Sequence, residues 1–315
     1  MMGEANYLFV RVLIASLLLT TMTSITSQFT LVHAQTSSSD CNNGLVMPKL
    51  EGGGVIHVPP VILIHGYIEN AAAWSNWEPW LQNDGIPFCT ASFVHSDDPC
   101  GNATDHANEL IQIVQKVKDF AQERHIMSNQ VNIVGHSKGG LDARVYLAQT
   151  GTHDVANLVM IGTPNGGDIL ANDVAAAVSF PFIPDWYNMF CRPALYDLKI
   201  GADATTSAEN NNTKYYTIYG DWSPTDYCPQ PPAYSLGRWA GLDWPELEKE
   251  GYYNLNGFFP PGTIPNDGIV PALSVESLPH YTNLNRFNSI HDCHTNLLSR
   301  PEYDLTKRIL NPSLP

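Results

Sequence analysis

The sequence predicts an α/β protein with a doubly wound, mostly parallel β-sheet. Short apolar runs at residues 61–64, 131–134 and 157–161 are rich in β-branched residues, which is typical of central strands covered on both faces. Helical patterns separate these runs, and such alternation of strand and helix predicts a parallel sheet with flanking helices. The chain has 315 residues, enough for one large domain with its own core.

The remaining elements follow in order. After the first strand, a helical segment carries Trp74, Trp77 and Trp80 on one face, which we interpret as core packing. Residues 105–124 have an apolar stripe at helical spacing and predict a long amphipathic helix. We expect further strands at residues 87–94, 215–221 and 281–288, a helix from residue 141, and a closing helix at residues 297–310.

Two long stretches interrupt this alternation, at residues 168–212 and 222–262. The first contains the largely apolar residues 174–190, and the second is rich in Pro, Gly, Tyr and Trp. Both follow strand ends on the side where doubly wound sheets bind ligands. We therefore expect a lid in residues 168–212 and walls of an apolar substrate pocket in both insertions.

The start of the chain is typical of an export signal. Arg11 precedes the apolar run 12–19, and Val32-His33-Ala34 resembles a cleavage site. We expect a signal peptide at 1–34 or an uncleaved anchor, then an N-terminal tail at 35–57 and the main domain at 58–315. The protein would be secreted or held at the cell surface.

An exported chain keeps its cysteines in an oxidising compartment, where an even number favours disulfides. The spacings of the six cysteines fit no zinc site. Cys89 and Cys100 flank a short segment, and Cys191 and Cys228 lie in the two insertions. These positions suggest the pairs Cys89–Cys100 and Cys191–Cys228, with Cys41–Cys293 as the remainder.

The formal net charge is −15. A surface with this charge repels the phosphates of nucleic acids, so we expect no nucleic-acid partner.

The strongest motif is Gly135-His136-Ser137-Lys138-Gly139, which lies between an apolar run and a helical pattern. A strand, a Gly-x-Ser-x-Gly segment and a helix in this order predict a nucleophile elbow, in which the strained turn holds the Ser137 hydroxyl above the sheet. Gly135 and Gly139 are expected because side chains there would collide with the neighbouring strand and helix.

A serine nucleophile needs a base and a carboxylate that orients it, and this fold places the acid before the histidine. Asp267, in an Asn-Asp-Gly turn, is the favoured acid, and Asp221 at a strand end is the alternative. His294, before the final helical pattern, is the favoured base over His280 and His291. Backbone N–H groups of Lys138 and Tyr67 are the candidate oxyanion-hole donors.

These motifs carry a family resemblance. The segments 60–66, 135–141, 161–167, 266–270 and 294–298 resemble secreted bacterial triacylglycerol lipases of the α/β-hydrolase fold. The resemblance covers roughly residues 58–310. It implies a Ser137–Asp267–His294 triad, an acyl-enzyme intermediate and a mobile lid, and it supports Asp267 over Asp221.

Three positions depart from the resemblance. Asn165 and Lys138 replace residues common in the relatives, and Asn296 replaces an Asp that binds calcium in some of them. The calcium site of those relatives is therefore not carried over to this chain, and no metal-binding residue and no cofactor are assigned. The predicted function is a secreted serine hydrolase for ester or lipid substrates, a lipase or esterase. Polyester depolymerase, thioesterase, acyltransferase and non-catalytic binding protein are the alternatives.

Overall fold

The fold is built on one parallel sheet. The computed structural model describes residues 39–48, 56–96, 100–168, 171–172, 175, 191–221, 267, 269–278, 285–290 and 292–312. Within them, the strands pair in the order β2-β1-β3-β4-β5-β6, and every pairing is parallel. The strands are β1 (Val61–Ile64), β2 (Phe88–Thr90), β3 (Val131–His136), β4 (Val155–Ile161), β5 (Lys214–Asp221) and β6 (Asn285–Ile290). The predicted doubly wound sheet is confirmed.

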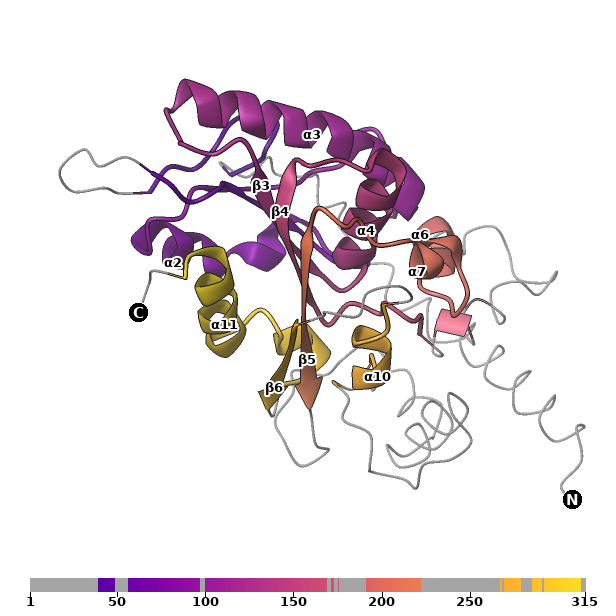
Figure 1. The fold of residues 1–315 in the computed structure, drawn as a ribbon. Helices are drawn as coiled ribbons and strands as arrows, with labels where there is room; N and C mark the ends of the chain where they lie inside the picture. Colours follow the sequence, from indigo (N-terminus) through magenta and orange to yellow (C-terminus); the bar gives the residue numbers. More distant parts are fainter. Residues whose placement is uncertain are drawn as a thin grey trace, which may run out of the picture.

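Helices cover both faces of the sheet (Figure 1). The longer ones are α2 (Trp77–Asn83), α3 (Ala103–Glu123), α4 (Lys138–Thr150) and α11 (Arg300–Leu310). Short helical segments are η2 (Ala71–Trp74), α6 (Arg192–Asp197), α7 (Asp203–Thr206), α10 (Ala272–Val275) and η4 (His294–Asn296).

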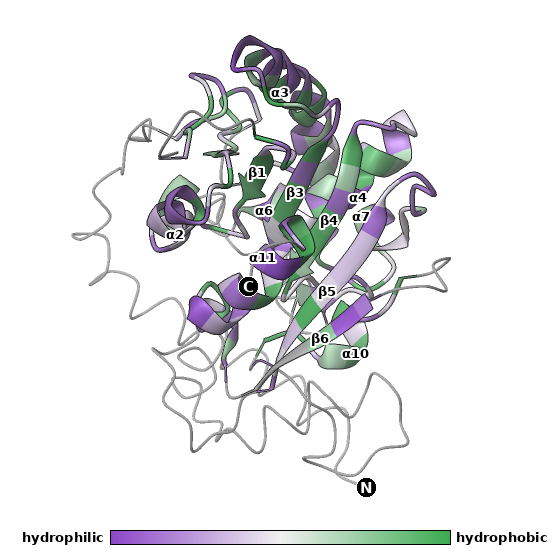
Figure 2. Cartoon of the chain, turned by 60° about the vertical axis from the view of Figure 1, so that its left-hand side comes forward, coloured by the Kyte–Doolittle hydropathy of each residue, from purple (hydrophilic) through white to green (hydrophobic). Residues whose placement is uncertain are grey.

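Two core clusters show which helices lie on which face. Successive strand residues point to opposite faces of a sheet. Ile62 and Ile133 pack in one cluster with residues of α3 and α4, whereas Leu63 and Val134 pack in the other with residues of α2 and α11. Strands that are covered on both faces must be apolar, and Figure 2 shows this apolar character for β1, β3 and β4.

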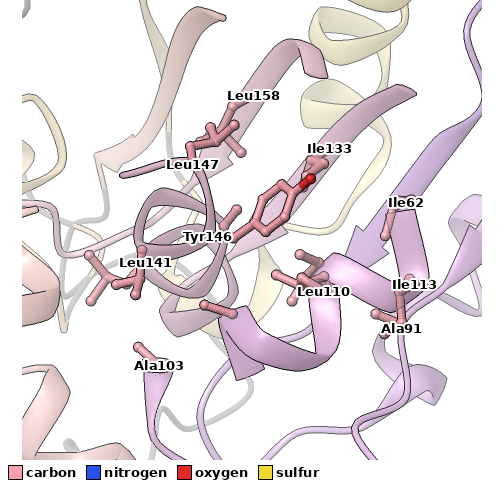
Figure 3. Packing of buried hydrophobic residues seen from close by; sticks show 14 of the residues in the cluster. Ile62, Ala91, Ala103, Leu110, Ile113, Ile133, Leu141, Tyr146, Leu147 and Leu158 are labelled. Carbon is pink, nitrogen blue, oxygen red and sulfur yellow. The ribbon is translucent and has the colours of Figure 1, made fainter. Parts of the chain in front are cut away.

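The helix α3 forms for the reasons that its sequence indicates. The Asn102 side chain caps its first turn by accepting a hydrogen bond from the Asp105 N–H at 2.8 Å. The predicted apolar stripe is buried, and Figure 3 shows Leu110 and Ile113 packed together with the strand residues Ile62 and Ile133.

The tryptophan prediction is also confirmed. Trp74 and Trp77 are fully buried in the second cluster, and Trp80 packs against it. The ring of Trp77 meets Tyr303 of α11 edge-on, with centroids 5.3 Å apart. These aromatic contacts join η2, α2 and α11 on one face of the sheet.

Some predicted boundaries are corrected. The strand expected at 87–94 is limited to Phe88–Thr90, and the closing helix begins at Arg300 instead of residue 297. Pro301 lies in the first turn of this helix, where its missing N–H costs nothing, and a separate 3₁₀ turn at His294–Asn296 precedes it.

All three predicted cysteine pairs are wrong. Cys41 pairs with Cys89, because residues 39–41 run along the edge strand β2 and Cys41 N–H donates to the Thr90 carbonyl. Cys100 pairs with Cys191, because the starts of α3 and α6 lie together. Cys293 is also disulfide-bonded, but not to Cys41. The prediction that the chain contains disulfides is confirmed.

Several predictions fall outside the described residues. They include the export signal at 1–34, the insertion at 222–262 and most of residues 169–190. Among the helices that are described, none has the length and apolar character needed to cross a membrane.

The strand order fixes where a site can form. From β1 the chain moves to β2 on one side, and later returns to place β3 on the other side of β1. The loop after β1 leads toward β2, and the loop after β3 leads toward β4 on the opposite side. Open α/β sheets bind ligands at the carboxyl ends of the strands between which the loops diverge in this way. Ser137 follows β3 at this point.

Candidate active site

Ser137 occupies a strained turn between β3 and α4. Its φ of 50° and ψ of −124° lie in a region that non-glycine residues rarely adopt. The Ser137 N–H donates to the Ile161 carbonyl at 2.8 Å, which ties the turn to β4. An added Cβ at Gly135 would lie 2.5 Å from the Gly140 nitrogen, and one at Gly139 would lie 2.5 Å from the Ile64 carbonyl oxygen. The reason given for both glycines is therefore confirmed.

The structure brings three of the predicted residues together. His294 Nε2 lies 3.0 Å from Ser137 Oγ, and His294 Nδ1 lies 2.7 Å from Asp267 Oδ2. The His294 N–H also donates to the Asp267 carbonyl oxygen at 2.8 Å. This is the geometry in which a carboxylate orients an imidazole that can take a proton from a serine hydroxyl.

Asp267 is fully buried, so its charge needs partners. The turn that follows provides them, because Asp267 Oδ1 accepts hydrogen bonds from the N–H groups of Ile269 at 3.0 Å and Val270 at 2.7 Å. Burial lowers the pKa of His294, but the charge of Asp267 and its hydrogen bond outweigh burial and raise that pKa. The nearby carboxylates of Glu69 and Asp168 act in the same direction.

Of the alternative acid and bases, the structure describes only the acid, Asp221. Asp221 ends β5, where it pairs in register with Ile290 of β6, and the His294 imidazole bonds to Asp267 instead. His280 and His291 lie outside the described residues.

The two candidate oxyanion donors lie in backbone beside Ser137, one at the start of a helix and one in a loop. Lys138 is the first residue of α4, and Tyr67 lies in the loop after β1, residues 65–70, here called the β1 loop. An added Cβ at Gly66 would lie only 2.8 Å from the Ser137 Cβ, so the β1 loop runs directly against the elbow. Both N–H groups thus belong to backbone that borders the serine.

The Lys138 side chain lies in a buried polar cluster. Its Nζ lies 2.6 Å from Asp142 Oδ1, one helical turn along α4, and 3.9 Å from Asp197. The other Asp142 oxygen lies 2.8 Å from His106 Nδ1. Sequence reasoning missed this cluster, although the spacing of Lys138 and Asp142 is that of a helical ion pair.

Two further residues were missed. Glu69 of the β1 loop and His136 at the end of β3 contact each other at 2.9 Å beside the elbow. No sequence motif identifies Glu69, and His136 is marked in the sequence only as part of the Gly-x-Ser-x-Gly segment. Among the described residues, no cluster of His, Cys, Asp or Glu could hold a metal ion.

The sheet order, the helices on both faces and the elbow define an α/β-hydrolase fold. A solved structure agrees: lipase BlEst2 of Bacillus licheniformis in its mature form matches with a TM-score of 0.57 and 19% identity, over 85% of this chain and 96% of that one. A family model described as palmitoyl protein thioesterase matches residues 60–224, more than half of the chain. The chain belongs to this family.

Relatives named as lipases match a shorter segment. Triacylglycerol lipases of Pseudarthrobacter phenanthrenivorans and Burkholderia plantarii are each 31% identical over 124 residues, 36% of this chain. The match spans only 36% and 32% of the length of these relatives. The resemblance to bacterial triacylglycerol lipases is confirmed over this shared segment.

Proposed function

We propose that this protein is a serine hydrolase that cleaves carboxylic esters through an acyl-enzyme on Ser137. The observation that carries the proposal is the hydrogen-bonded chain from Ser137 through His294 to Asp267. A serine hydroxyl alone is a weak nucleophile, and this chain supplies the base that it needs.

In the proposed mechanism, Ser137 Oγ attacks the carbonyl carbon while its proton passes to His294 Nε2. Asp267 holds the imidazole by its Nδ1–H and stabilises the imidazolium. The N–H groups of Tyr67 and Lys138 stabilise the negative charge on the carbonyl oxygen. His294 then protonates the leaving alcohol. A water molecule, deprotonated by His294, then attacks the acyl carbon. The bond between this carbon and Ser137 Oγ breaks, His294 returns the proton to Ser137 Oγ, and the acid is released.

The relatives support the substrate class that we propose. Those named triacylglycerol lipase favour an ester or lipid substrate. The palmitoyl protein thioesterase family match favours a second candidate, the hydrolysis of acyl thioesters. The same residues serve both reactions, because only the leaving group changes from an alcohol to a thiol.

We also propose that the protein acts outside the cytoplasm. The disulfides Cys41–Cys89 and Cys100–Cys191 support this location, because such bonds persist in oxidising compartments.

The first test is chemical labelling and turnover. We expect a fluorophosphonate probe to label Ser137, with loss of label and of ester hydrolysis in Ser137→Ala. Nitrophenyl esters and acyl thioesters of increasing chain length, with and without an emulsion, will separate lipase, esterase and thioesterase activity. A melting transition will show that the wild type is folded. If the folded wild type is not labelled, this result contradicts the proposal and favours a binding protein.

A further inference from the structure

Glu69 contacts two of the segments that surround Ser137. Its Oε2 accepts a hydrogen bond from the Gly66 N–H at 2.7 Å and lies 2.9 Å from His136 Nδ1. Gly66 is the residue before Tyr67, so the Glu69 carboxylate closes the β1 loop on itself at the candidate oxyanion donor. The Glu69 side chain remains 30% exposed, whereas that of His136 is 2% exposed.

His136 extends this connection to the base. Its Nε2 lies 3.2 Å from the carbonyl oxygen of His294, and the two imidazole rings lie with centroids 5.0 Å apart. Both partners of His136 are acceptors, a carboxylate and a carbonyl. Burial raises the pKa of Glu69, but the charge of His136 and its hydrogen bond outweigh burial and lower the pKa of Glu69 to about 2.

We propose that Glu69 and His136 form a positioning pair that holds the β1 loop and the His294 backbone in register around Ser137. This inference rests on the proposed function. These contacts form a continuous chain from the Gly66 N–H, next to the candidate oxyanion donor Tyr67, through Glu69 and His136 to the carbonyl oxygen of His294. Neither residue touches the reacting atoms. Each acts through the Tyr67 N–H or the His294 ring.

The pair has an electrostatic consequence that simple packing would not have. The Glu69 carboxylate is one of the charges that raise the pKa of His294. Removing this negative charge lowers the pKa of His294, so His294 stays neutral down to a lower pH. Because the base must be neutral to act, the acidic limb of kcat/KM then moves to lower pH.

The test compares Glu69→Gln, Glu69→Asp and the control Glu123→Gln in the full chain. Glu123 lies exposed at the end of α3, so its variant makes the same change of charge away from the site. We expect kcat to fall about 10- to 100-fold in both Glu69 variants with little change in KM, the cost of a slightly misplaced group. The acidic limb should move in Glu69→Gln and stay closer to wild type in Glu69→Asp. The control should match wild type.

A second readout does not depend on activity. NMR titration of the imidazole Cε1–H of His294 should show its protonation moving to lower pH in Glu69→Gln. If the wild type neither labels nor turns over but this shift occurs, the pair stands and the proposed function fails. If the wild type is active while Glu69→Gln keeps both its kcat and its His294 titration, the positioning pair is overturned.

Discussion

At the scale of single residues, the site depends on backbone strain at Ser137. Its positive φ comes with a ψ that suits glycine, and such conformations cost of order 1–3 kcal/mol in other residues. The surrounding structure enforces this conformation through the Ile161 hydrogen bond and the close approach of Gly139 to β1. The fold therefore holds the Ser137 backbone in this conformation at a cost in stability.

This strain can be measured by comparing two inactive variants. Ser137→Gly removes both the hydroxyl and the strain, whereas Ser137→Ala removes the hydroxyl alone. We expect Ser137→Gly to be more stable than Ser137→Ala by about 1 kcal/mol, after the greater chain entropy of unfolded glycine is subtracted. Urea unfolding of both variants is the measurement, and equal or lower stability of Ser137→Gly would argue against strain.

At the scale of an element, α4 is a helix buried on nearly all sides that carries charges in its first turns. Lys138 and Asp142 are both about 1% exposed and lie one turn apart. Burial raises the pKa of Asp142, but the charges of Lys138 and His106 outweigh burial and lower it. The ion pair therefore keeps the helix that begins at the elbow compatible with a dry interior.

Removing one partner of this ion pair should destabilise the fold more than replacing both partners with apolar residues. Asp142→Asn removes the nearest carboxylate of the buried Lys138 ammonium and leaves only Asp197, 3.9 Å away, so we expect a loss of about 3–5 kcal/mol in the free energy of unfolding. The double variant Lys138→Met with Asp142→Leu should recover most of this loss. Since the folded pKa of Asp142 is lowered, its contribution is present at neutral pH and disappears as pH falls through that pKa.

Denaturant unfolding at neutral and acidic pH will check both statements. A loss below about 1 kcal/mol in Asp142→Asn, or a double variant no better than the single one, would show that the pair contributes little.

At the scale of the whole molecule, two disulfides join segments that are distant in sequence. Cys41–Cys89 fixes the residues before the main domain to the edge strand β2, across a separation of 48 residues. Cys100–Cys191 joins the start of α3 to the start of α6, across 91 residues. Both crosslinks restrict the unfolded chain, and the dependence on loop length is only logarithmic.

Removal of each disulfide should therefore have a similar effect. We expect Cys41→Ala with Cys89→Ala, and Cys100→Ala with Cys191→Ala, each to lose about 4 kcal/mol in the free energy of unfolding, the two within about 1 kcal/mol of each other. Thermal and urea unfolding under oxidising conditions provide the comparison. If either double Cys→Ala variant is as stable as the wild type, the disulfide that it lacks does not stabilise the fold by restricting the unfolded chain.

The sequence by itself determined the parallel sheet, the elbow and the buried stripe of α3, because these features depend on local periodicity and on glycines that permit close approach. It also narrowed the acid and base to a few residues. Only the tertiary structure decided the cysteine pairs, the contact of His294 with Asp267 and the contacts of Glu69 with Gly66 and His136. These contacts join segments that come together only when strand order is fixed, and no local pattern encodes strand order.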